Sequence, residues 1–128
     1  MFSHFIEMTR CEPFEWGQND CALWCASAVK FVTGFDPASD LRGTYKTQFE
    51  CRQKIIRAGG LLRLIQPRMI APAICDFDQT LDGVAVVRAD RRQLCALIVQ
   101  GRAVLRMETG LRLVDDFEIV RGWSCLKH

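Results

Sequence analysis

The spacing of apolar residues changes once along this chain, from helical periodicity in the first half to short strand-like runs in the second. Near the N-terminus, Phe2, Phe5 and Ile6 recur at helical spacing, which predicts an amphipathic helix within residues 1–11 that packs over its neighbours as a lid. Residues 46–65 predict a second helical segment, in which a glycine pair separates one helix from a further turn.

Residues 19–34 predict a central helix that is buried on nearly all sides. Asn19 or Asp20 can cap its first turn, and Gly34 supplies the left-handed residue at which helices commonly end. From Ala22 to Val32, only Ser27 and Lys30 are polar. A helix that is apolar nearly all round belongs in the interior of a domain.

Residues 83–126 predict an antiparallel β-meander. Turn residues separate its short apolar runs, which are Val84–Val87, Leu94–Val99, Ala103–Met107, Leu111–Val114 and Trp123–Leu126. Asp115–Val120 is expected to add a last helical turn, whereas residues 66–81 show no regular pattern. Helices followed by strands within 128 residues are typical of one α+β domain, so we expect residues 1–128 to form a single domain.

The composition excludes several classes of partner. With 17 basic and 15 acidic residues, the formal net charge of +2 is too small to predict a nucleic-acid surface, and the local excess at Arg88–Arg92 fits a solvated turn between two strands. Charged and proline residues interrupt every long apolar stretch, so we expect no membrane insertion.

The seven cysteines are expected to be reduced, because their number is odd and no secretory leader is evident. Cys25, Cys75 and Cys95 lie in apolar surroundings, where a free cysteine acts as a small hydrophobic residue. Cys21 and Cys25 are one helical turn apart, but no further ligands follow at zinc-finger spacing. We therefore expect neither a metal nor a cofactor.

Cys21 is the candidate catalytic residue, because it falls in the first turn of the predicted central helix. Unpaired amides and the helix dipole at that end favour a thiolate, so they lower a cysteine pKa, while the neighbouring Asp20 opposes this effect. The alternative is that Cys21 is a small core residue at a crowded helix start.

Several strings of residues carry a family resemblance: Trp16-Gly17, Asp20-Cys21, Thr33-Gly34-Phe35-Asp36-Pro37 and Arg42-Gly43-Thr44-Tyr45. In this order they resemble the leading half of short phage proteins within the NlpC-type superfamily of cell-wall cysteine peptidases. A weaker similarity continues through Asp82–Val87 and Cys95–Val99, although the family's usual glycine-aspartate order is reversed at Asp82-Gly83. The resemblance implies a papain-like α+β fold, with the central helix packed on the meander.

In active members of that superfamily, the cysteine works with a histidine on the second strand of the meander and with a polar residue on the next strand. By position this histidine falls at Leu94 or Cys95, and neither can act as a general base. The two histidines present, His4 and His128, lie near the chain ends and do not match the motif.

These observations favour a phage or prophage tail-associated structural protein, acting at the tail tip or in assembly, with a catalytically degenerate peptidase fold. Its implied partners are other phage tail proteins, and its implied location is the bacterial host cytoplasm during assembly and then the virion tail. The alternative is an active peptidoglycan-cleaving cysteine peptidase or amidase, with Cys21 as nucleophile and peptidoglycan stem peptides as substrate. A third hypothesis is another acyl-transfer or deamidating activity on the same scaffold.

Overall fold

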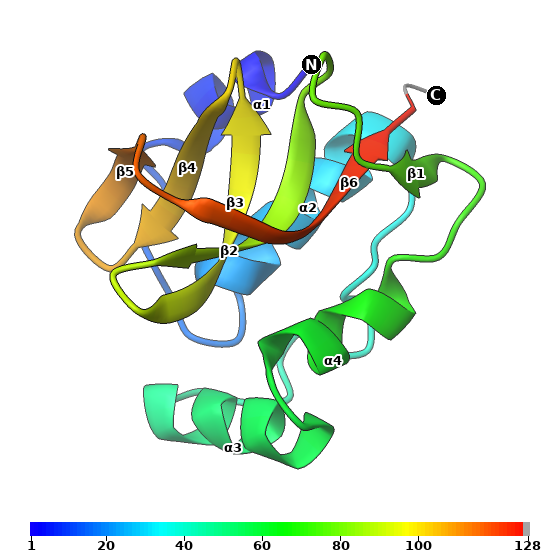
Figure 1. Cartoon of the computed structure of the whole chain (residues 1–128). Helices are drawn as coiled ribbons and strands as arrows, with labels where there is room; N and C mark the ends of the chain where they lie inside the picture. Colours follow the sequence, from blue (N-terminus) through cyan, green and yellow to red (C-terminus); the bar gives the residue numbers. More distant parts are fainter. Residues whose placement is uncertain (127–128) are drawn as a thin grey trace.

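The computed structural model describes residues 1–126 and has an α+β architecture (Figure 1). Its elements, in chain order, are α1 (Ser3–Thr9), α2 (Cys21–Thr33), α3 (Gln48–Ala58), α4 (Leu61–Ile65), the short 3-10 helix η1 (Gln66–Arg68), β1 (Ile74–Asp76), β2 (Gly83–Ala89), β3 (Arg92–Val99), β4 (Arg102–Met107), β5 (Gly110–Val114) and β6 (Glu118–Cys125). Four helices and a six-stranded antiparallel sheet therefore form the described part of the chain.

The strands β2 to β5 form the predicted meander, and the sheet order is β1-β6-β2-β3-β4-β5. Tight turns set its registers: Asp90 and Arg91 join β2 to β3, and Gln100 and Gly101 join β3 to β4, all four with positive φ. The arginine-rich stretch between β2 and β3 is thus a hairpin turn, as the sequence indicated.

The helical turn expected at Asp115–Val120 is wrong, because β6 begins at Glu118 and continues to Cys125. Ile119 pairs with Val87 of β2, and its side chain packs together with Phe117 in an apolar cluster of the sheet. The apolar residues at alternating positions from Phe117 onward therefore indicate a strand and not a helical turn. In the segment that gave no regular pattern, the structure has η1 and the short strand β1, which pairs with the end of β6.

Helix α2 lies between the sheet and the loop that follows it, as its apolar sequence predicted. Its side chains Trp24 and Val29 belong to the main core with β2, β3 and β4, while Leu23 on another side packs in a second cluster with Tyr45. The helix is enclosed less completely than expected, since Phe31 in its last turn is 42% exposed.

A further apolar cluster lies on the sheet face that points away from α2. Strand β2 is buried on both faces, and its outer side chains meet residues from β3, β4, β5 and β6. Figure 1 shows the sheet strongly bent, with β6 running across the other strands. The bend closes the sheet over its own second face, so no helix is needed on that side.

Helix α1 packs along the flank of α2. The rings of Phe5 and Trp24 lie with centroids 5.6 Å apart, and the Trp24 indole donates a hydrogen bond of 2.9 Å to the Thr9 hydroxyl. Helices α3 and α4 pack on each other at one end of the molecule (Figure 1).

Candidate functional site

A groove with a volume of about 330 Å³ opens beside the start of α2, where Cys21 is the first helical residue. One wall is the loop before α2 with Trp16, the second is α3, and the third is the beginning of β3. The polar or reactive side chains along the groove are Asp20, Cys21, Gln48, Cys51, Arg52, Arg92, Gln93 and Cys95. Helix α1 packs on α2 and contributes no residue to this groove.

The Cys21 thiol is half-buried and donates a hydrogen bond of 3.0 Å to the backbone carbonyl of Cys95 on β3. Burial raises the pKa of Cys21 to about 12, and the negative charge of Asp20 adds to this rise. A backbone interaction with Cys95 and the charge of Arg92 lower the pKa of Cys21 but are too weak to reverse the rise. The thiolate expected from the position at the helix start is therefore disfavoured, since desolvation outweighs the helix end.

Asp20 is fully buried and serves as the N-cap of α2. Its carboxylate accepts hydrogen bonds of 3.0 Å from the Leu23 amide, 3.0 Å from the Gly17 amide and 2.5 Å from the Tyr45 hydroxyl. Gly17 lies at φ +82°, and a Cβ there would come within 1.8 Å of the Tyr45 carbonyl oxygen. Gly17, Asp20 and Tyr45, which belong to the motifs that carry the family resemblance, thus fix the loop against the start of α2.

Asp36 and Arg42 belong to the two later motifs of the family resemblance, and they hold the loop after α2 in place. The Arg42 guanidinium forms an ion pair of 2.8 Å with Asp36 and donates a hydrogen bond of 3.0 Å to the Ser27 hydroxyl of α2. The bidentate contact between Arg42 and Asp36 therefore fixes the loop on itself, and the single hydrogen bond to Ser27 ties the loop to α2.

No histidine of the described residues 1–126 lies at the groove. His4 is on α1, where its ring centroid is 5.8 Å from that of Phe31. Phe31 follows Cys21 by about ten helical residues, which corresponds to about 15 Å along α2. His128 lies outside the described residues.

Leu94 and Cys95, the two positions at which the resemblance places a histidine, both lie on β3 and line the groove. The backbone of Cys95 accepts the Cys21 hydrogen bond, while its own side chain is buried in the main core. Burial raises the pKa of the Cys95 thiol well above its usual range. Neither thiol of this pair is therefore prepared to act as a nucleophile or base at neutral pH.

Arg106 lies on the neighbouring strand β4, two residues beyond Val104, which pairs with Leu97 of β3. Its side chain is 3% exposed and donates hydrogen bonds to the backbone carbonyls of Arg10 and Glu12, in the loop after α1. The sequence contained a signal for this role, because Arg106 is a charged residue at an inward position of an apolar strand run.

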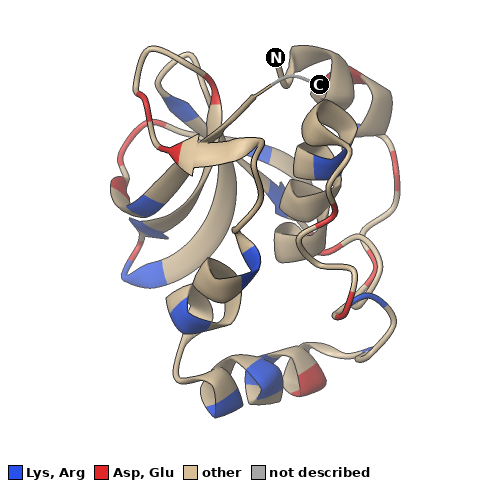
Figure 2. Cartoon of the chain, turned by 90° about the vertical axis from the view of Figure 1, so that its right-hand side faces the viewer, with Lys and Arg blue, Asp and Glu red and all other residues tan. Residues whose placement is uncertain are grey.

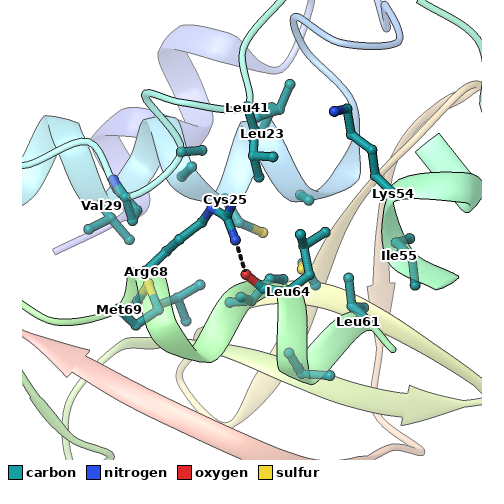
Figure 3. Close-up of a pocket in the computed structure, with 18 of the residues that line it drawn as sticks. Leu23, Cys25, Val29, Leu41, Lys54, Ile55, Leu61, Leu64, Arg68 and Met69 are labelled. Atoms are coloured by element: carbon teal, nitrogen blue, oxygen red, sulfur yellow. Dashed lines mark hydrogen bonds between the residues drawn. The ribbon is translucent and has the colours of Figure 1, made fainter. Parts of the chain in front are cut away.

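A second cavity, of about 60 Å³, lies between α2 and the α3–α4 pair (Figure 3). Its lining is almost entirely apolar, and Arg68 closes one side by donating a hydrogen bond to the Leu64 carbonyl. The groove at Cys21 gathers more charged and polar side chains and is the larger space, so it is the candidate site.

Within residues 1–126, no group of three or more cysteine, histidine, aspartate or glutamate side chains is placed to hold a metal ion. None of the helices in the same part of the chain is long and apolar enough to cross a membrane.

Fold and groove together define an α+β protein with a cysteine at the start of a central helix packed on a bent antiparallel sheet. The chain belongs to the family described as a domain of unknown function (DUF6950), whose model matches residues 1–125. Searches of curated proteins and of solved structures return no match to the chain.

Proposed function

We propose that this chain is a phage or prophage tail-associated assembly protein, in which an NlpC-type, papain-like arrangement is kept and Cys21 no longer acts as a nucleophile. The observation that carries the proposal is the state of the Cys21 thiol. It is hydrogen-bonded to the Cys95 carbonyl and its pKa is raised to about 12, so it is protonated at neutral pH.

The residues at the two partner positions support the same reading. In an active relative of the superfamily that the chain resembles, a histidine and a second polar residue lie on adjacent strands beside the cysteine. Here the resemblance places the histidine at Leu94 or Cys95, and neither can act as a base. On the next strand, the polar side chain of Arg106 is engaged with the backbone carbonyls of Arg10 and Glu12. A nucleophile without its base loses most of the acceleration that the cooperating groups provide together.

The strings that the chain shares with the superfamily also have a structural explanation. Asp20 and Gly17 hold the helix start against Tyr45, and Asp36 with Arg42 holds the following loop. These contacts preserve the shape of the domain whether or not hydrolysis occurs. The assignment to a phage tail rests on the resemblance alone.

The groove gives one specific argument for the alternative, an active peptidase or amidase. Trp16, Arg52, Arg92 and Gln93 surround an open space that could accept an acidic peptide, and Cys21 forms part of its lining. On this alternative, substrate binding would have to lower the pKa of Cys21 and provide the missing base.

The first test compares wild-type protein with Cys21→Ala on purified peptidoglycan, with soluble fragments measured by mass spectrometry. We expect no fragment release above background from either protein. Release by the wild type that Cys21→Ala abolishes would establish the alternative.

The second test places the same substitution in a phage or prophage that carries the gene. We expect Cys21→Ala particles to have complete tails and normal infectivity, whereas deletion of the gene abolishes tail assembly. Complete, infectious tails after deletion would contradict the assembly role.

A further inference from the structure

Helix α3 stands away from the body of the protein. It contributes no fully buried side chain, and its principal packing partner is the short helix α4. Figures 1 and 2 show α3 at one end of the molecule in both views, with the sheet and α2 on the far side of α4. The side chains of Phe49, Arg52, Ile56 and Arg57 on α3 are exposed, and Arg52 also lies at the edge of the groove beside Cys21.

This exposed face of α3 carries two large apolar side chains, Phe49 and Ile56. They are 69% and 75% exposed, which places them among the most exposed large apolar residues of the described chain. A spacing of seven residues is two helical turns, so both side chains project from the same face, about 10 Å apart along the axis. The apolar side chain Ile55 on the other face packs against the main core instead.

Arginines border this apolar pair. Arg52 and Arg57 lie on either side of the Phe49–Ile56 line. Neither forms a salt bridge within residues 1–126, in contrast to Arg10, Arg42, Arg68, Arg88, Arg102, Arg112 and Arg121. The acidic residue of the helix, Glu50, is already engaged, because it accepts hydrogen bonds from the Lys46 amide and the Thr47 hydroxyl at the helix start.

We propose that the outward face of α3, formed by Phe49, Arg52, Ile56 and Arg57, is a docking surface for a partner protein segment that presents an apolar ridge flanked by carboxylates. The charge pattern determines this chemistry: the surface offers two unpaired guanidinium groups around an apolar centre, and carboxylates are their complementary ligands. Figure 2 shows the corresponding excess of basic over acidic positions on α3.

A protein partner fits this surface better than a lipid bilayer. Aromatic residues and arginine are enriched at the centres of protein interfaces, where they provide most of the binding energy. Membrane-surface helices need a longer apolar stripe, and two side chains on an 11-residue helix anchor weakly. Arg52 also lines the groove at Cys21, whereas Phe49, Ile56 and Arg57 do not, so the proposal holds whether or not Cys21 is catalytic.

The test uses two helical peptides as probes. Both carry leucines spaced to form one apolar stripe, flanked by glutamates in the first peptide and by lysines in the second. We expect wild-type protein to bind the glutamate peptide at least about tenfold more tightly than the lysine peptide, measured by fluorescence anisotropy. Phe49→Ser with Ile56→Ser should weaken that binding about tenfold, and Arg52→Glu with Arg57→Glu should reverse the peptide preference.

Matched controls make the same chemical changes elsewhere. Leu113→Ser on β5 removes another exposed apolar side chain, and Lys30→Glu with Arg91→Glu makes the same change of charge away from α3. Neither control should change either affinity. Circular dichroism and thermal unfolding should show every variant folded, because the substituted side chains are exposed.

Three results would overturn the proposal. The first is equal affinity for the two peptides, or an affinity that the α3 variants leave unchanged. The second is α3-dependent sedimentation with vesicles of phosphatidylglycerol and phosphatidylcholine, which would show that the face binds lipid. The third is concentration-dependent dimerisation in analytical ultracentrifugation that the Phe49→Ser, Ile56→Ser variant abolishes, since the partner would then be a second copy of the chain.

Discussion

Asp20 and Cys21 are adjacent in the chain and make opposite electrostatic demands. The Asp20 carboxylate accepts hydrogen bonds from three donors that hold the start of α2. Burial of the Cys21 thiol, in contrast, favours its protonated, uncharged form. The charge of Asp20 raises the pKa of its neighbour. A residue that stabilises the helix start therefore suppresses the reactivity of the cysteine beside it.

The importance of Asp20 can be measured directly. Asp20→Ala removes the helix cap and leaves the Gly17 amide and the Tyr45 hydroxyl without their acceptor, so we expect the free energy of unfolding to fall by about 3 kcal/mol. Tyr45→Phe removes only one of the three donors and should cost about 1 kcal/mol. Urea denaturation provides both values, and equal losses for the two variants would contradict the central role of Asp20.

At the scale of elements, the sequence predicted best where both ends of a segment carry their own signals. Helix α2 has an aspartate cap and a glycine stop, and α3 ends at Gly59 with positive φ, so both were predicted within a residue or two. The meander was predicted from its turns. Each of these predictions used only neighbours in the sequence.

Local signals failed at Asp115–Val120. This stretch is strand because Ile119 pairs with Val87 and Glu118 with Arg88, and these partners are distant in the sequence. Strand β1 was missed for the same reason, since its three residues pair with the end of β6. Tertiary pairing decides such short segments.

The sequence predicted the position of the candidate site but not its chemical state. The position of Cys21 at a helix start follows from local signals, but its hydrogen bond to the Cys95 carbonyl joins residues 74 positions apart. The direction of the pKa shift depends on that packing, because burial outweighs the helix end. No local pattern contains this information.

At the scale of the whole molecule, the buried thiols and Tyr45 make the fold sensitive to alkali. Burial raises the pKa of Cys21 to about 12 and of Cys125 to about 11, and it raises those of Cys25, Cys95 and Tyr45 as well. The unfolded chain loses these protons first, with cysteine pKa values near 9.0. Stability contributed by these groups is therefore complete below pH 9 and is lost as the pH rises toward 12.

We accordingly expect the free energy of unfolding to fall between pH 9 and pH 11, with each such group adding a slope of up to about 1.4 kcal/mol per pH unit. Denaturant titrations at several pH values, under reducing conditions, measure this slope. Cys21→Ala should make it shallower. A free energy of unfolding that stays constant over this range would show that burial does not raise the pKa values of these thiols.

The central claim of the account is that Cys21 is a protonated, hydrogen-bonded thiol and not an activated nucleophile. The most direct measurement is the rate of its alkylation by iodoacetamide against pH, followed by mass spectrometry, with the exposed Cys11 as an internal reference. The account predicts that Cys21 reacts at least about a hundredfold more slowly than Cys11 at pH 7, and that its rate is still rising at pH 10. Faster reaction at Cys21 than at Cys11, with a plateau already reached below pH 7, would contradict it.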